Sequence, residues 1–258
     1  MQKIYTIIRK EWAEVFKNRF VLFTVACMPL LYTAMPLIIL STGEGFGTIG
    51  DIPPELSAFC ENAGGEACLQ SFILSQFLML YMIMPIIIPI TIASYSIVGE
   101  KTTRTLEPVL ATPISTVELL TGKAMAAVIP ALLATWGSYV ALYIGANIII
   151  PGPTTSTLLT QPMWLLAIFA IGPLLSVAGV SIAVMVSSRA NDPRVAEQLS
   201  ALVNLPLMML FIGQVSGYIS LTQTTFLWLA AALFVIDVGL LYFAARIFQR
   251  ETILTRWK

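Results

Sequence analysis

The chain has 258 residues, of which 57% are hydrophobic and 11% are charged, and it contains no histidine. A soluble domain carries about 25% charged residues, and disorder requires low hydrophobicity, so the composition excludes both classes. Basic and acidic residues are equal in number, at 14 each, so there is no basic excess for binding nucleic acid. The lack of histidine removes histidine-based catalysis and metal sites, and three cysteines cannot form a four-thiolate site. This composition is typical of a protein embedded in a lipid bilayer.

Residues 3–19 are predicted to form an amphipathic helix in the membrane interface. One face has the three- and four-residue spacing of apolar side chains that defines a helix face. It comprises Ile4, Ile7, Ile8, Trp12, Val15 and Phe16. The other face carries Lys3, Arg9, Lys10, Glu14 and Lys17. The pattern leaves two interpretations open: a simple topology anchor, or an elbow helix that also contacts a cytosolic partner.

Six stretches are long and apolar enough to cross a membrane, since a helix needs about 20 apolar residues to span the hydrocarbon core. Gaps between charged residues define most of these stretches. The long uncharged run between Lys123 and Arg189 is divided by the turn-forming residues of 151–162. The predicted spans are 20–40, 71–98, 124–150, 163–187, 199–216 and 226–245.

The basic residues support this count. All 14 precede the first span, follow the sixth, or lie between spans two and three or four and five. The positive-inside rule makes this side cytoplasmic. The chain is therefore expected to span the inner (plasma) membrane of the cell, with both termini in the cytoplasm. The formal charge of zero is then the sum of an inner face at +6, an outer face at −5, and Asp237 within the membrane.

Residues 41–70 form the largest predicted outer loop. The loop has five acidic residues, no basic residue, and both Cys60 and Cys68. If this side is oxidising, the two cysteines are predicted to form a disulfide, and two free thiols are the alternative. Cys27, in the first span, is interpreted as a small packing residue.

Residues 99–123 are the most informative segment. A short helix of mixed charge is predicted from about Glu100, and Thr112-Pro113 ends it. Ser115 followed three residues later by Glu118 is a capping box that starts the next helix. Apolar residues that insert into a groove, with charges that set register, suit a docking element. An ordinary charged loop with a helical turn is the alternative.

This segment resembles the first cytoplasmic loop of the ABC-2 type permeases, the membrane subunits of a class of ATP-binding-cassette exporters. Residues 100–123 read Glu-Lys-x-x-x-Thr-Leu-Glu-x-x-Leu-x-Thr-Pro-x-Ser-x-x-Glu-Leu-Leu-x-Gly-Lys. The resemblance extends to the amphipathic N-terminal helix, the six spans, the large first outer loop and the second cytoplasmic loop at 188–194. In that loop Asp192 is predicted as an N-cap, with Pro193 in the first helical position.

The resemblance implies an all-α membrane fold of the ABC-2, or type V exporter, kind. Residues 1–19 would be an elbow helix and 20–258 the transmembrane domain, with 99–123 as the coupling loop that contacts an ATPase. The coupling residues implied are Glu100, Lys101, Arg104, Leu106, Glu107, Val109 and Leu110.

The sequence contains no nucleotide site of its own. Gly122-Lys123 is the only Gly-Lys pair. A phosphate-binding loop needs an earlier glycine where Val117 stands, and serine or threonine where Ala124 stands. We therefore expect a transport subunit that is not an enzyme and binds no cofactor. The resemblance implies ATP and Mg²⁺ on two copies of a partner ATPase, and a second permease that is either identical or related.

Three polar residues within the spans are candidates for the pathway or a helix interface. Asp237 is the only charged residue well inside a span, where a charge costs at least about 2.5 kcal/mol. It either contacts a substrate or cation, or is protonated between helices. Asn204 and Gln214 lie in the fifth span, and a re-entrant turn at 213–225 would fit the family. The candidate kinks are Pro85, Pro89, Pro173 and Pro206.

The function predicted is that of a permease subunit forming a translocation pathway. An intramembrane protease is excluded, because it needs histidine or a pair of membrane aspartates. An ion-coupled secondary transporter or channel would have more intramembrane ionisable groups. That class is kept as an alternative, and so is a membrane anchor for a cytosolic ATPase without transport.

Overall fold

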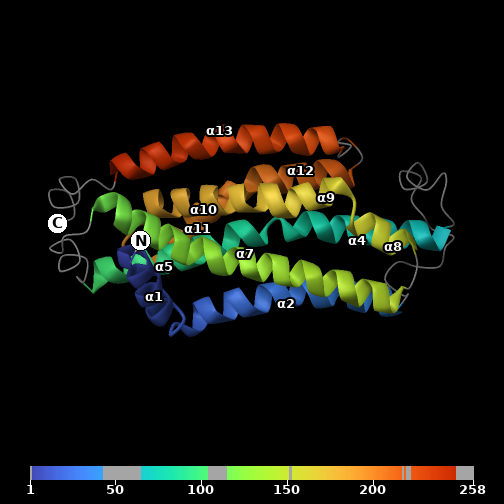
Figure 1. The fold of residues 1–258 in the computed structure, drawn as a ribbon, viewed down its shortest axis with the longest axis horizontal. Helices are drawn as coiled ribbons and strands as arrows, with labels where there is room; N and C mark the ends of the chain where they lie inside the picture. Colours follow the sequence, from blue (N-terminus) through green and yellow to red (C-terminus); the bar gives the residue numbers. More distant parts are fainter. Residues whose placement is uncertain are drawn as a thin grey trace.

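The structure is a computed structural model that describes residues 2–42, 65–103, 115–150, 153–216, 218 and 222–247. The described residues form helices and turns without a strand, and the long helices run side by side in one bundle (Figure 1). Six helical segments in this part of the chain are long and apolar enough to cross a membrane. The predicted all-α fold with six spans is confirmed.

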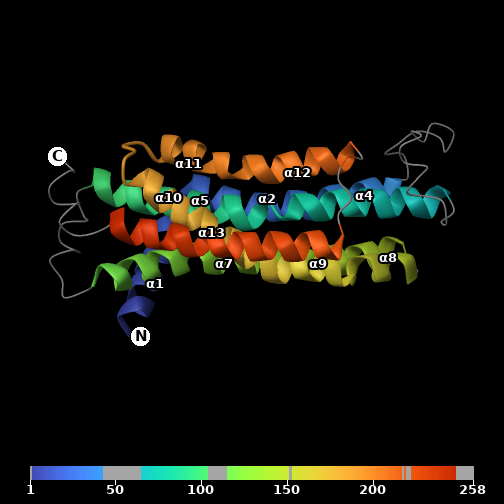
Figure 2. The ribbon, with the colours of Figure 1, turned by 90° about the horizontal axis from the view of Figure 1, so that it is seen from above.

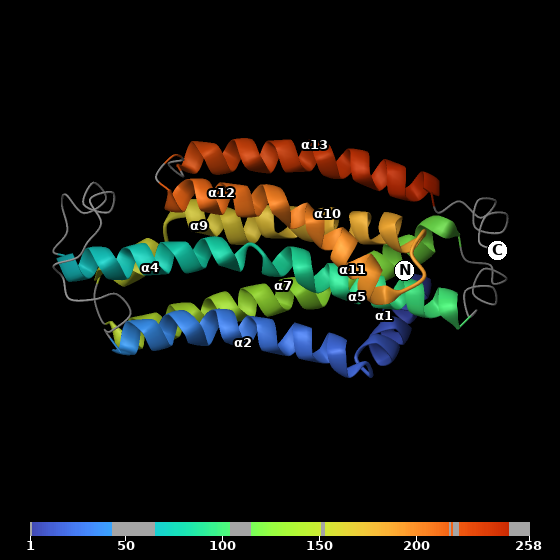
Figure 3. The same ribbon diagram turned by 180° about the vertical axis from the view of Figure 1, so that it is seen from behind.

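The N-terminal helix α1 (Gln2–Val15) runs across the ends of the spans rather than along them (Figure 3). It ends earlier than the predicted 3–19, because a turn separates it from the first span, α2 (Arg19–Thr42). In that turn the Asn18 side chain accepts a hydrogen bond from the backbone N–H of Phe20 at 3.0 Å. Ile7 and Val15 are buried, so one face of α1 packs on the bundle.

The second span is central to the bundle and consists of α4 (Gly65–Tyr81) and α5 (Met84–Thr102). The break between them falls just before Pro85, one of the predicted kinks, whereas Pro89 lies inside α5. Residues of α5 are buried along nearly its whole length, since the helix packs against α2, α7, α10 and α11. The core of the molecule is therefore built around α5.

The third span, α7 (Thr116–Ile149), begins before the predicted residue 124 because the predicted capping box forms. The Glu118 N–H donates to Ser115 Oγ at 3.1 Å, and the Ser115 N–H donates to the Glu118 carboxylate at 2.9 Å. A short helix, α8 (Pro153–Leu159), follows where only a turn was expected.

The fourth span contains α9 (Pro162–Leu166), a π-helical turn η2 (Ala167–Ile171) and α10 (Gly172–Ser187). The wide π turn directly precedes Pro173, which has no N–H to continue a regular helix. At Gly179 a Cβ atom would lie 3.1 Å from the backbone oxygen of Ile86, so α10 and α5 approach as closely as small residues allow.

The fifth span is α11 (Pro193–Ala201), a 3₁₀ turn η3 (Leu202–Asn204) and α12 (Leu205–Val215). Asp192 is its N-cap, as predicted, and accepts a hydrogen bond from the Arg194 N–H at 2.7 Å. Pro206 follows η3 in the first turn of α12. The sixth span, α13 (Gln223–Ile247), packs mainly on α10. Of the predicted re-entrant turn at 213–225, residues 217 and 219–221 lie outside the described residues.

Every described basic residue lies in α1 or near the end of another helix, at one end of the bundle, which we call the basic end. Figures 1 and 2 show that α1, the end of α5, the start of α7, the α10–α11 turn and the end of α13 gather there. The residues are Lys3, Arg9, Lys10, Lys17, Arg19, Lys101, Lys123, Arg189, Arg194 and Arg246. The start of the first span and the end of the last span both lie at this end, as an even number of membrane crossings requires.

Candidate functional site

Four polar side chains are buried at the basic end, where α1 lies over α5 and α7. Glu11 comes from α1, Ser96 and Glu100 from α5, and Lys123 from α7, and we call them the buried polar cluster. Glu11 is 3% exposed, Glu100 and Lys123 are 5% exposed, and Ser96 is 9% exposed. Charged residues are almost never buried to this extent unless they are paired.

Local sequence explains how Glu11 enters this site. Glu11 is four residues after Ile7 and four before Val15, so the three share one stripe of α1. Both neighbours are buried, and the stripe therefore carries the carboxylate into the interface with the bundle. Gly122 permits the approach, because a Cβ atom there would lie 2.8 Å from Ile7 Cγ2.

The four side chains form one connected network. Lys123 Nζ lies 2.7 Å from Glu11 Oε1, 2.9 Å from Glu100 Oε2 and 2.8 Å from Ser96 Oγ. The Ser96 hydroxyl in turn donates to the second oxygen of Glu11. Lys123 is thus surrounded by three oxygens from two different helices, and Ser96 fixes the orientation of the Glu11 carboxylate.

Lys10 closes the network at its rim. Its ammonium is 2.5 Å from Glu100 Oε1 and 3.5 Å from Glu14, which lies on the exposed side of α1. Partial burial lowers the pKa of Lys10, but the hydrogen bond with Glu100 and the charges of Glu100, Glu11 and Glu14 together outweigh it and raise the pKa above its ordinary value. With Lys10 included, two carboxylates (Glu11 and Glu100) face two ammonium groups, so the network has no net charge when Glu14 is set aside.

A cleft of about 350 Å³ opens beside the network between α1 and α5. Its lining includes Glu11 and Glu100, together with Glu14, Tyr95 and Gly99. Three glutamates thus line the cleft, and two of them are the carboxylates that hold Lys123.

The network joins the two ends of loop 99–123. Glu100 is the second residue of this loop and Lys123 is the last, and their side chains are 2.9 Å apart. At the start of the loop, Lys101 donates to the backbone oxygens of Ala190 at 3.0 Å and Ser188 at 3.4 Å, in the turn between α10 and α11. Both predicted cytoplasmic loops are therefore tied together at the basic end.

Of the predicted coupling residues, the structure places Glu100 and Lys101 in this arrangement. The remainder, Arg104, Leu106, Glu107, Val109 and Leu110, lie outside the described residues. Sequence reasoning missed Glu11, Ser96 and Lys123 as site residues. A signal existed for Glu11, because a glutamate within an apolar stripe indicates a buried partner. The sequence carried no comparable signal for Ser96.

The three polar candidates within the spans are not brought together. Asp237 is 4% exposed, and neither of its carboxylate oxygens has a hydrogen-bond partner among the described residues. The same holds for Asn204 Oδ1 and Gln214 Oε1. Within the described ranges no hydrogen bond or ion pair links any two of these residues.

Other predicted features have mixed outcomes. Cys27 is a free, half-buried cysteine. Cys60 lies outside the described residues, as does the side chain of Cys68 on α4, so their disulfide stays a prediction. Across the described part of the chain, no three Cys, Asp or Glu side chains are grouped closely enough to hold a metal ion.

Comparison with known families agrees with this architecture. The family model described as "ABC-2 family transporter protein" matches residues 5–245. The chain belongs to the ABC-2 transporter family, and it is a multi-pass membrane permease of the ABC transporter type. No protein of curated function matches the sequence. The family identified from the pattern at 100–123 is confirmed.

Proposed function

We propose that this chain is the permease subunit of an ATP-driven exporter and that loop 99–123 couples it to a separate ATPase subunit. The observation that carries the proposal is the pairing of Glu100 with Lys123, both of which are buried. Glu11 holds Lys123 to α1, and Lys10 holds Glu100 to it. Because its two ends are joined, the loop should move as one rigid unit when the ATPase displaces it, and so move the spans attached to it. A loop with unconnected ends would change its own shape instead.

The path from the loop into the bundle supports this role. Glu100 is on α5, the helix around which the core is packed, and Lys123 is on α7, the third span. A push on the loop therefore reaches two spans together. Thr91 on α5 also donates to Glu197 on α11 at 2.5 Å, which ties the fifth span to the same central helix.

The partner subunit supplies what this chain lacks. ATP and Mg²⁺ are expected on the ATPase, because the only Gly-Lys pair here has neither the glycine nor the hydroxyl of a phosphate-binding loop. We propose two ATPase copies and a second permease, identical or related. The basic end would face the cytoplasm of an inner (plasma) membrane, with both termini inside, because basic residues concentrate on that side.

The direct test is reconstitution of the permease with ABC-type ATPase subunits from the same organism. We expect the pair to purify together and Leu106→Ala or Glu107→Gln to lower both co-purification and permease-stimulated ATP hydrolysis. Glu14→Gln is the matched control, since Glu14 is an exposed glutamate of α1 outside the loop. If no ATPase co-purifies, or if loop and control variants behave alike, the proposal is wrong.

The same preparation distinguishes the alternatives. An anchor without transport would bind the ATPase but move no substrate when ATP is added. A secondary transporter would move substrate with an ion gradient alone and without ATP.

A further inference from the structure

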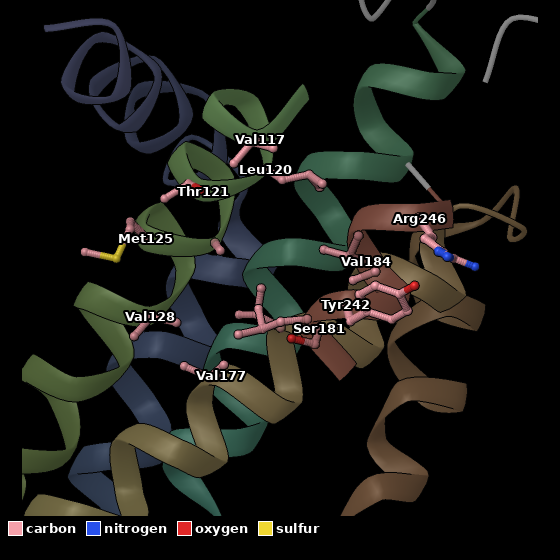
Figure 4. Close-up of a pocket in the computed structure, with 14 residues that line it drawn as sticks. Val117, Leu120, Thr121, Met125, Val128, Val177, Ser181, Val184, Tyr242 and Arg246 are labelled. Carbon is pink, nitrogen blue, oxygen red and sulfur yellow. The ribbon is translucent and has the colours of Figure 1, made fainter. Parts of the chain in front are cut away.

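A second hollow at the basic end lies outside the buried polar cluster. It has a volume of about 760 Å³ and runs between α7, α10 and α13 (Figure 4). Its floor is α10, from Val177 to Val184, and its two walls are α7 and α13. We call it the α7–α13 groove.

Helix packing explains why the groove is open. Helix α10 packs against both α7 and α13, whereas α7 and α13 hardly touch each other. On the floor, Val180, Ser181 and Val184 are buried, while rim residues such as Val117 and Tyr242 are more than half exposed. The groove therefore opens sideways between two spans, toward the lipid that surrounds a membrane protein.

The lining of the groove is mostly apolar and has one charged residue at one end. Most lining side chains are aliphatic, and the hydroxyl groups of Thr121, Ser181 and Tyr242 are the neutral polar groups among them. Arg246 is the only charged residue of the lining, and its guanidinium lies 4.7 Å from the centre of the Tyr242 ring. This cation–π contact holds the charge at one end of the groove.

The charge of Arg246 is not neutralised within the part of the chain that the structure describes, where no carboxylate lies within 4.0 Å of it. An arginine of this kind favours a phosphate, because its planar donors match phosphate oxygens. The occupant that fits is thus an amphiphile with an acidic head and an apolar tail.

We propose that the α7–α13 groove binds an acidic phospholipid from the leaflet at the basic end, with its phosphate on Arg246 and an acyl chain along α10. Basic pockets between spans on the cytoplasmic side are recognised binding places for such head groups. The volume falls within the range of small-ligand sites, roughly 300 to 1,000 Å³. The inference stands independently of ATPase coupling.

Native mass spectrometry of the detergent-purified chain tests this. Phosphatidylglycerol and phosphatidylcholine with identical acyl chains are titrated separately, and bound lipid is counted. We expect about a fivefold preference for phosphatidylglycerol, the factor that one basic residue near an anionic lipid supplies. Arg246→Gln should abolish the preference, and Thr121→Phe, which adds a ring at the exposed rim, should weaken binding of both lipids.

Two control variants separate the groove from its surroundings. Arg189→Gln removes an exposed arginine at the same end, and Ala141→Phe adds a ring to an exposed position of α7 away from the groove. Both should bind lipid as the unmodified chain does. Equal binding of the two lipids, or a preference that survives Arg246→Gln, overturns the proposal. The proposal is also wrong if Thr121→Phe dissociates a dimer without changing lipid binding. It is wrong as well if lipid binds only after residues 248–258 are removed.

Discussion

Replacing Lys123 by methionine tests whether the buried polar cluster holds α1, α5 and α7 together. The substitution keeps an unbranched side chain that is one atom shorter, and it leaves Glu11 and Glu100, at 3% and 5% exposure, without the ammonium that lies 2.7 and 2.9 Å from them. Removing one partner of a buried ion pair costs about 3–5 kcal/mol. For a chain of this size that lowers the Tm by on the order of 10 °C.

The measurement is thermal unfolding in detergent, followed by the loss of the monodisperse peak on size exclusion. The control removes the three buried charges together: Glu11→Gln, Glu100→Gln and Lys123→Met combined leave only Lys10, at the exposed rim beside Glu14. Neutral replacements of buried ion pairs are commonly tolerated, so we expect this triple variant to recover most of the lost Tm. An unchanged Tm in Lys123→Met would refute the reasoning, as would a triple variant no more stable than the single one.

Three further predictions concern α1, α13 and the rim of the cluster. Gly122→Ala places a Cβ atom 2.8 Å from Ile7 Cγ2 and should destabilise the docked α1 by about 1–3 kcal/mol, seen as faster proteolysis between α1 and α2. Gly137→Ala, where a Cβ would meet nothing within 4 Å, is its control, and equal proteolysis of the two would contradict the close approach. Asp237→Asn should not lower the Tm, because it removes a buried carboxyl that has no hydrogen-bond partner among the described residues; a fall comparable to that of Lys123→Met would show that the carboxylate is paired. Because the pKa of Lys10 is raised above its ordinary value, its pair with Glu100 stabilises the fold while both groups are charged, and this stabilisation is lost as the pH rises through the raised pKa of Lys10. The Tm difference between the unmodified chain and Lys10→Gln should then be constant from about pH 7 to pH 9 and shrink at higher pH, and a difference that shrinks already near pH 8 would contradict this.

Local signals in the sequence were sufficient for the six spans and for two helix starts, but not for the end of α1 or for the short helix α8. The capping box at Ser115 and Glu118 and the N-cap at Asp192 formed as predicted, because each depends on residues two or three positions apart. The breaks before Pro85 and Pro173 also follow from a missing backbone N–H.

The cluster could not be predicted in the same way, because its geometry is tertiary. Glu11 and Lys123 are 112 residues apart, and nothing near either residue specifies the other as its partner. Lys123 stands at the end of a recognised pattern, yet its role emerges only when α1 is placed across α7. The groove at Arg246 has the same origin, since it depends on α7 and α13 being held apart by α10.

The separation of Glu11 from Lys123 has a consequence for biogenesis. A ribosome adds about 5–20 residues per second, so Glu11 waits for roughly 6 to 22 s until Lys123 has been synthesised. During that time α1 lacks the ammonium that its buried carboxylate requires. The first helix to be made is therefore locked in place only after the third span has begun, and its docking reports that this span has been inserted correctly.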